Sequence, residues 1–239
     1  MNIYNKMKSL CDLLERAASN VPRRGVVIVN NSQNDTFMSY SELKSRSERI
    51  AFELQSVYQI KPLSKIVVSV EKSEDFILLF WGSVMAGCVP ILMPSVQFSN
   101  KKTIAFERLN NTIGIVGEMT LITSDINLCE SFKSTAYKVI YSENIIRQSD
   151  LLEDFPLYRL EMNASDLCVI QFSSGSTGAP KGVMLSFDNI LSNLKLKTLA
   201  DEITAEDTLI HWMPYFHDYG LFGNHLLCLY NQITEVKIE

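Results

Sequence analysis

The stretch Phe172-Ser173-Ser174-Gly175-Ser176-Thr177-Gly178-Ala179-Pro180-Lys181-Gly182-Val183 concentrates small, hydroxyl-bearing and basic residues. From Gln171 to Gly182 there are three glycines, four hydroxyl side chains, one lysine and no acid. Glycines allow successive backbone N–H groups to turn toward an anion, and the hydroxyls and the lysine add further donors. The composition therefore predicts a loop that binds a polyphosphate, because a carboxylate in the loop would repel one.

This loop does not follow the common nucleotide-binding patterns. The Walker A pattern Gly-x-x-x-x-Gly-Lys-Ser/Thr is not matched, since Pro180 precedes Lys181 and Gly182 follows it. The pattern Gly-x-Gly-x-x-Gly is not matched either. Taken alone, the stretch could also be a flexible Ser/Gly turn between two strands, because such turns are common. The position of Pro180 beside Lys181 argues against simple flexibility.

Helical and strand patterns alternate around the loop, which indicates an α/β protein with mostly parallel sheets flanked by helices. Apolar, β-prone runs predict strands at residues 25–29, 65–70, 88–93, 120–123, 138–140, 166–172, 182–185, 208–212 and 234–238. Helical spacing predicts helices at residues 7–18, 74–86, 126–132, 187–199 and 219–229, with another after residue 101. Ser39-Tyr40-Ser41-Glu42 fits a capping box that begins a further helix. Residues 142–164 are expected to form an irregular surface connection.

The charge-free run from residue 76 to residue 100 raises the question of a membrane span. A spanning helix needs about 20 uninterrupted apolar residues. Gly87 and Pro90 divide this run into a helix and a short strand, so we expect a buried helix-to-strand unit and no membrane span.

Composition excludes several other classes of protein. The chain has 239 residues, 46% of them hydrophobic and 21% charged, as in an ordinary globular protein. A formal charge of −5 predicts no nucleic acid partner, which would require clustered positive charge. Five cysteines without a Cys-x-x-Cys pair indicate neither a disulfide framework nor a zinc site. The N-terminus lacks a signal-peptide pattern, and a cytoplasmic location is expected.

The three histidines, His211, His217 and His225, could suggest a metal triad. Their spacing places them on a predicted strand, a loop and a helix, and no second cluster of ligands accompanies them. We therefore expect no zinc site.

Three motifs resemble the adenylate-forming superfamily of AMP-dependent synthetases and ligases. Residues 172–183 are similar to its phosphate-binding signature. Residues 211–221, HWMPYFHDYGL, resemble its segment that lines the acyl pocket, and residues 80–90, FWGSVMAGCVP, resemble its buried helix leading into a strand. Because Asp218 follows His217, this motif most resembles that of fatty acyl-AMP ligases and of adenylation domains that load carrier proteins.

The resemblance implies ATP-dependent activation of a carboxylic acid, and more narrowly of a fatty acid. In the family the carboxylate attacks the α-phosphate of Mg-ATP, which gives acyl-AMP and pyrophosphate. A thiol of coenzyme A or of an acyl carrier protein then accepts the acyl group. The expected cofactors are therefore ATP and Mg²⁺, and the expected partners are the acid substrate and either acyl carrier protein or coenzyme A.

The same resemblance assigns roles to residues in the matching motifs. The residues expected to hold the ATP phosphates are Ser173, Ser174, Gly175, Ser176, Thr177, Gly178, Lys181 and Gly182. The expected catalytic residues are Lys181, against charge on the departing pyrophosphate, and His217, near the junction of carboxylate and α-phosphate. The residues expected to bind substrate are Met213, His217, Asp218 and Leu221. Four side chains would suit an apolar acyl pocket, those of Met213, Tyr215, Leu221 and Phe222. Judged without the family, His217 could be a structural residue and these four side chains could belong to the core.

The resemblance also implies an incomplete N-terminal domain. Residues 1–164 are expected to form a first α/β subdomain of the large N-terminal domain, and residues 165–239 to begin a second one with the phosphate loop and the acyl-pocket motif. The C-terminal domain and an aromatic-Gly-x-Thr-Glu segment that holds Mg²⁺ are expected beyond Glu239. Thr234-Glu235 lacks the aromatic residue and the glycine of that segment. We therefore expect little or no adenylation by this chain alone.

Two other functions stay open. A noncatalytic relative could bind nucleotide or a carrier protein without chemistry, and the length of the reading frame would distinguish it. An unrelated P-loop NTPase would need the Walker A pattern that this sequence does not have.

Overall fold

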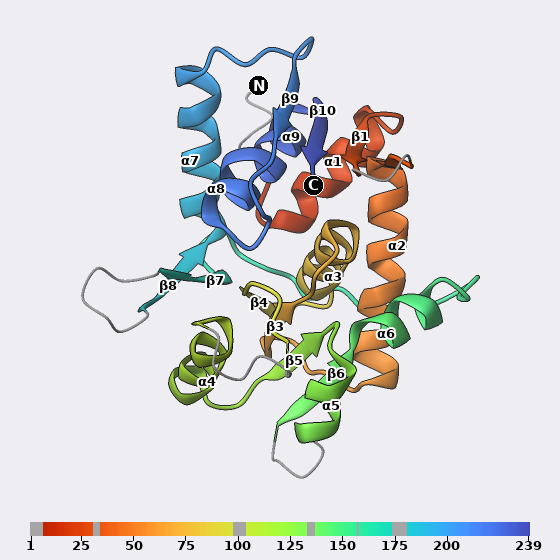
Figure 1. The fold of residues 1–239 in the computed structure, drawn as a ribbon. Coiled ribbons are helices and arrows are strands. Elements are labelled where there is room, and N and C mark those ends of the chain that lie inside the picture. The colour runs from red at the N-terminus through yellow and green to blue at the C-terminus, as the bar shows by residue number, and fades with distance from the viewer. Residues whose placement is uncertain (1–6, 31–33, 98–103, 133–136, 157, 174–180) are drawn as a thin grey trace.

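The computed structural model describes residues 7–30, 34–97, 104–132, 137–156, 158–173 and 181–239 (Figure 1). Its strands form two sheets. The four-stranded sheet runs in the order β2 (Thr36–Ser39), β1 (Gly25–Val29), β10 (Thr234–Ile238), β9 (Thr208–His211). The six-stranded sheet runs in the order β6 (Lys138–Tyr141), β5 (Thr120–Thr123), β3 (Lys65–Ser69), β4 (Val89–Leu92), β7 (Leu167–Ser173), β8 (Lys181–Ser186). Only β1–β2 and β7–β8 pair antiparallel among these strands, so the sheets are mostly parallel as expected.

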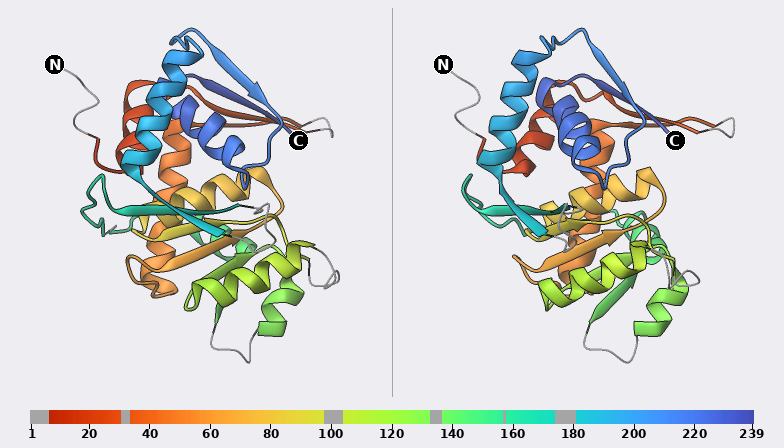
Figure 2. Two further views of the ribbon diagram at one scale, coloured as in Figure 1. Left: turned by 90° about the vertical axis from the view of Figure 1, so that its left-hand side faces the viewer. Right: turned by 60° about the vertical axis from the view of Figure 1, so that its left-hand side comes forward.

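Some helices lie between the two sheets, and others cover the outer face of the six-stranded sheet. They are α1 (Leu10–Asn20), α2 (Tyr40–Phe52), η2 (Glu53–Val57), α3 (Ser73–Met85), α4 (Ile104–Val116), α5 (Ile126–Phe132), α6 (Ser142–Ser149), α7 (Phe187–Ala200), α8 (Asp218–Gly220), η4 (Leu221–His225) and α9 (Leu226–Asn231), where η marks a π-helix. One hydrophobic core joins both sheets to α1, α2, α3, α7 and α9. A second core packs α4 and α5 on the opposite face of the six-stranded sheet, at the end away from β9 and β10 in Figures 1 and 2.

Both faces of the six-stranded sheet are buried at the inner strands β3, β4 and β5, which explains their continuous apolar sequences. Successive side chains of a strand point to opposite faces. In β3, Ile66 and Val68 belong to the first core and Val67 to the second, and in β5 the neighbours Ile122 and Leu121 divide in the same way. Parallel strands covered on both sides are typically apolar runs without alternation.

Helix α3 is apolar around most of its circumference because it lies inside the first core. Nine of its residues are buried, among them Phe80 and Trp81, which are fully buried. Gly82 faces α2 so closely that a Cβ atom there would lie 2.4 Å from Cγ2 of Ile50. The predicted helix-to-strand unit is confirmed, and no helix among the described residues is long and apolar enough to cross a bilayer.

The structure differs from the sequence expectations at three places. Residues 142–149 form helix α6, which was expected to be irregular; its sequence is mostly polar, and the fully buried Ile145 anchors it. Strand β2 was not predicted, because it is a short edge strand that depends on pairing with β1. The helix expected at residues 219–229 is divided into α8, η4 and α9, and the side chain of Asn224 donates to the Tyr219 carbonyl at 2.9 Å within the irregular turn.

Two further expectations concern the start of α2 and the division of the chain. The Ser39 hydroxyl accepts from the Glu42 N–H at 3.1 Å, which confirms that half of the capping box. Each sheet draws strands from both sides of the expected boundary at residues 164 and 165. The two sheets are therefore the structural units used below, and that division of the chain stays a prediction.

Candidate functional site

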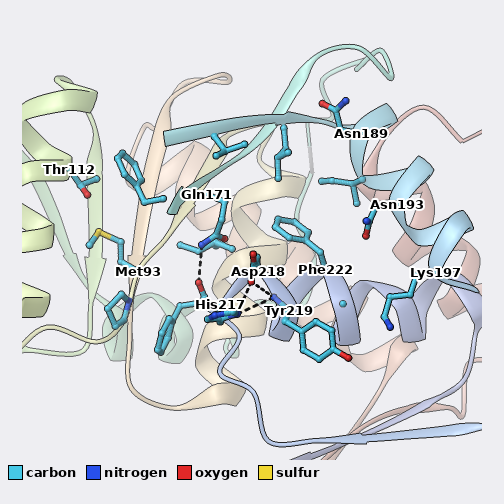
Figure 3. Close-up of a pocket in the computed structure, with 18 residues that line it drawn as sticks. Met93, Thr112, Gln171, Asn189, Asn193, Lys197, His217, Asp218, Tyr219 and Phe222 are labelled. Atoms are coloured by element: carbon cyan, nitrogen blue, oxygen red, sulfur yellow. Dashed lines mark hydrogen bonds and ion pairs between the residues drawn. The ribbon is translucent and has the colours of Figure 1, made fainter. Parts of the chain in front are cut away.

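A pocket of ≈ 940 Å³ opens beside the carboxyl ends of the neighbouring parallel strands β4 and β7 (Figure 3). Open α/β sheets bind ligands at this edge, because the connections there leave a crevice beyond the strand ends. The lining is mostly apolar. It consists of Leu92, Met93, Pro94, Thr112, Gln171, Phe172, Val183, Leu185, Asn189, Ile190, Asn193, Lys197, Phe216, His217, Asp218, Tyr219, Phe222 and Gly223.

Helix α7 supplies a polar ridge along one side of the pocket. Asn189, Asn193 and Lys197 are four residues apart, so their side chains share one helix face, as Figure 3 shows. The helix is held at its start by a reciprocal capping box between Ser186 and Asn189. At the other end of the ridge, the Lys197 ammonium forms an ion pair with Asp201 and lies 5.5 Å from the centroid of the Tyr219 ring.

A hydrogen bond joins the strand before the glycine-rich loop to the segment that carries His217. Nε2 of Gln171, in β7, donates to the Phe216 carbonyl at 3.1 Å. Two residues after Gln171 the strand ends at Ser173, and the loop begins. The bond therefore places the end of β7 and the segment of His217 at the same side of the pocket, although they are far apart in the sequence.

His217 lies at the pocket wall and is half exposed. It is the N-cap residue of α8, and its Nδ1 atom accepts from the Tyr219 N–H at 3.2 Å. The same Nδ1 atom is 2.7 Å from Oδ1 of Asp218, and the two side chains are 52% and 66% exposed. When His217 is protonated, Nδ1 carries a proton and donates to Asp218; when it accepts from the backbone, the proton is on Nε2. The Asp218 carboxylate therefore lies beside the ring of a histidine that lines the pocket.

A network of buried polar side chains lies behind this segment. Oε1 of Glu235 is 2.8 Å from Nε2 of His211 and accepts from the Tyr215 hydroxyl at 2.9 Å. Oε2 of Glu235 is 2.6 Å from Nδ1 of His225, whose Nε2 accepts from the Trp81 indole at 2.9 Å. Burial raises the pKa of the Glu235 carboxyl, but its close contacts with His225 and His211, which include a hydrogen bond from each ring, outweigh burial and lower that pKa to about 2. Glu235 is therefore an ionised carboxylate.

The structure places the sequence-predicted site residues in three groups. His217 and Asp218 line the pocket. Met213 is half-buried and Leu221 is fully buried in the first core, and neither is among the lining residues. Ser173 ends β7, and Lys181 and Gly182 begin β8, where both are exposed. Ser174, Gly175, Ser176, Thr177 and Gly178 lie outside the described residues.

Sequence reasoning missed most of the lining. Phe216 and Tyr219, within the acyl-pocket motif, line the pocket and were not expected there. Phe222 also lines it, as expected, whereas Met213, Tyr215 and Leu221 do not. Phe216 precedes α8, and Phe222 lies in the π-helix η4, so regular helical spacing could not predict which side chains face the pocket. The ridge on α7 did carry a signal, because polar residues recur four apart along an amphipathic helix.

The described flanks of the glycine-rich loop fit a phosphate group. Ser173 and Lys181 are paired across the antiparallel β7–β8 ladder, so the lysine stands at the base of the loop. Lys181 is exposed and has no carboxylate partner among the described residues. Within the same residues, no group of three His, Cys, Asp or Glu side chains is arranged to hold a metal ion. His211 and His225 both lie close to Glu235, but each of them is hydrogen-bonded to an oxygen of that carboxylate.

The fold and the pocket define an α/β domain with a mostly apolar pocket at the carboxyl edge of a mostly parallel sheet. The chain belongs to the AMP-binding enzyme family, whose sequence pattern it matches over residues 14–238. This agrees with the resemblance carried by the three motifs.

Comparisons with individual proteins give the same picture. The chain is 26% identical over 238 residues to nonribosomal peptide synthetase apvA of Aspergillus terreus, covering 97% of this chain and 25% of that protein. It is 27% identical over 238 residues to the medium-chain-fatty-acid–[acyl-carrier-protein] ligase JamA of Moorena producens, covering 95% of this chain and 39% of that protein. The chain therefore spans between a quarter and two fifths of the length of these relatives.

The fold is also that of a solved adenylation domain. A keto acid-selecting domain of a nonribosomal peptide synthetase, bound to a keto acyl adenylate, superimposes with a TM-score of 0.86 at 23% identity, covering 99% of this chain and 42% of that one. At this identity the match shows the fold.

Proposed function

We propose that this chain is part of a ligase that converts a carboxylic acid and ATP to acyl-AMP and pyrophosphate. The observation that carries the proposal is the hydrogen bond between Gln171 and Phe216. It brings the strand that leads into the glycine-rich loop against the His217 segment, at one side of an apolar pocket. A strand that leads into a predicted phosphate loop and lies beside an apolar pocket suits a reaction between a phosphate ester and an apolar acid.

The residues of the site then have distinct roles. The acid carboxylate attacks the α-phosphate, and the bond from the α-phosphate to pyrophosphate breaks. Ser173 to Gly178 and Gly182 would hold the phosphates through backbone and hydroxyl donors, and Lys181 would stabilise negative charge on the departing pyrophosphate. His217, supported by Asp218, would orient the carboxylate. Mg²⁺ would neutralise the phosphates, held by residues beyond Glu239.

Supporting features favour a fatty acid and a carrier-protein acceptor. The pocket is mostly apolar, and its volume suits an extended hydrocarbon chain. The Moorena producens relative is named a medium-chain-fatty-acid–[acyl-carrier-protein] ligase. Coenzyme A is the alternative acceptor. A cytoplasmic location and a large N-terminal domain that continues beyond residue 239 complete the proposal.

The test is ATP–pyrophosphate exchange with a panel of carboxylic acids. We expect acid-dependent exchange from the polypeptide encoded by the complete reading frame and little or none from the 239-residue chain. Lys181→Ala in the complete polypeptide should lower the exchange rate about 100-fold, as for loss of one donor to developing charge. Lys195→Ala, at an exposed position of α7, is the matched control and should leave the rate unchanged. Nucleotide or carrier binding without exchange would instead support the noncatalytic module.

Filling the pocket from α7 should change the choice of acid. We expect Asn193→Trp to lower kcat/KM for long-chain acids by at least about tenfold, while short-chain acids are little affected, because the indole would occupy the space of the chain end. Ser192→Trp, one residue earlier on the exposed surface of the same helix, is the control. An equal loss for all chain lengths would argue against this assignment of the pocket.

A further inference from the structure

The three groups that bond to Glu235 lie at the start, the middle and the end of one segment. His211 ends β9, Tyr215 lies in the connection that follows, and His225 ends η4. His217 lies between them. Glu235 itself belongs to β10, an inner strand that pairs with both β1 and β9, and it is fully buried. A single carboxylate on a rigid strand therefore holds residues 211–225 at three points.

Trp81 fixes the direction of these hydrogen bonds. An indole N–H can only donate, so Nε2 of His225 accepts, and Nδ1 of His225 carries the proton that it donates to Glu235. An ionised carboxylate can only accept, so Nε2 of His211 also donates. Nδ1 of His211 is buried and has no hydrogen-bond partner among the described residues. Within the same residues, the His211 ring is therefore held by its hydrogen bond to Glu235.

The connection in the middle of residues 211–225 has few restraints other than this network. The backbone of residues 212–217 does not belong to a sheet or helix. His217 and Asp218 are largely exposed, so packing does not fix them. The described contacts that tie this connection to the rest of the molecule include the Gln171–Phe216 bond and the Tyr215–Glu235 bond. Charged hydrogen bonds are stronger than neutral ones, which makes the second the stronger restraint.

We propose that Glu235 is the positioning residue for His217. Its carboxylate holds both ends and the middle of residues 211–225, so that His217 faces the pocket from a fixed backbone. The role in positioning a reacting group rests on the proposed function, whereas the restraint on the segment does not. Glu235 thus takes no part as a metal ligand, even though a Thr-Glu pair resembles one in sequence.

The experiment is amide hydrogen exchange on the 239-residue chain. In Glu235→Gln the side chain keeps its size, but its single acceptor oxygen cannot serve His211, Tyr215 and His225 together. We expect amides of residues 212–220 to exchange at least about tenfold faster at neutral pH, with amides of β3 unchanged under native conditions. Glu53→Gln is the matched control, since Oε2 of the buried Glu53 has no partner among the described residues and burial raises the pKa of that carboxyl. It should leave residues 212–220 unaffected.

A milder variant keeps the proposal testable if Glu235→Gln does not fold. Tyr215→Phe removes only the hydroxyl that donates to Oε1. It should accelerate exchange of residues 212–217 a few-fold. Unchanged exchange of residues 212–220 in both folded variants, or faster exchange spread evenly over the chain, would overturn the proposal.

Kinetics of the complete polypeptide separate positioning from simple stability. We expect Glu235→Gln to lower kcat at least about tenfold with little change in the KM for ATP, measured well below the unfolding temperature. An unchanged kcat would overturn the positioning role. If the wild-type polypeptide shows no exchange with any acid, the proposed function fails, and the amide data still decide whether Glu235 restrains the segment.

Discussion

Replacing Gly220 with alanine is expected to destabilise the protein by about 3 kcal/mol, a loss typical of severe overpacking. The last residue of α8 touches the preceding connection so closely that a Cβ atom would lie 2.0 Å from the Pro214 carbonyl oxygen and 2.7 Å from its carbon. Both are backbone atoms, so the connection before His217 would have to move. For a chain of this size the change corresponds to a fall in Tm of roughly 6–12 °C, measurable by calorimetry.

Gly114→Ala is the control for the Gly220 prediction. Gly114 lies within α4, and no described atom would come within 4 Å of its Cβ. Alanine is the better helix former by about 1 kcal/mol, so this variant should be slightly more stable than the wild type. If Gly220→Ala and the wild type have the same free energy of unfolding, residues 213–214 can move to accommodate the Cβ atom without destabilising the fold, which would contradict the prediction.

Trp81→Phe is expected to cost about 3 kcal/mol, the combined effect of a lost buried donor and a small cavity. The fully buried Trp81 on α3 donates to Nε2 of His225, and phenylalanine would leave that nitrogen buried without a donor. The measurement is denaturant unfolding. We also expect the losses from Trp81→Phe and Glu235→Gln to be non-additive in the double variant, because both residues bond to the same imidazole.

The second tryptophan provides the control for Trp81. Trp212 is 73% exposed, and Trp212→Phe should change stability by no more than about 0.5 kcal/mol. The chain has two tryptophans, so this control variant also isolates the fluorescence of Trp81. A Trp81→Phe variant as stable as Trp212→Phe would mean that the indole–imidazole bond contributes nothing.

Most elements of the fold could be predicted because their signals are local. Strands β1, β5 and β10 and helix α5 have the predicted bounds, and the other strands that were predicted agree to within one residue at each end. Alternation or continuity of apolar residues reports burial directly. Helix α6 and strand β2 escaped prediction since each has few apolar residues and depends on a neighbour, α6 on the core around Ile145 and β2 on its pairing with β1.

The candidate site could be predicted in part. His217 and Asp218 were expected near the substrate and do line the pocket, whereas the π-helix η4 turns Leu221 into the core and Phe222 toward the pocket. The roles of Ser173 to Gly178 and of Lys181 stay predictions. The order of strands, with β10 between β1 and β9, could not be predicted from the chain order alone.

By itself the sequence determined the α/β class, most of the element bounds, the glycine-rich loop and the resemblance to the family. Each of these depends on residue types within a short window. Only the tertiary structure decided that Trp81, from one motif, and His211 and Tyr215, from another, meet at His225 and Glu235. Trp81 and His225 are 144 residues apart, and their contact follows from the packing of α3 against η4. Burial makes a carboxylate depend on every available donor, and which donors reach it is set by the packing of distant elements.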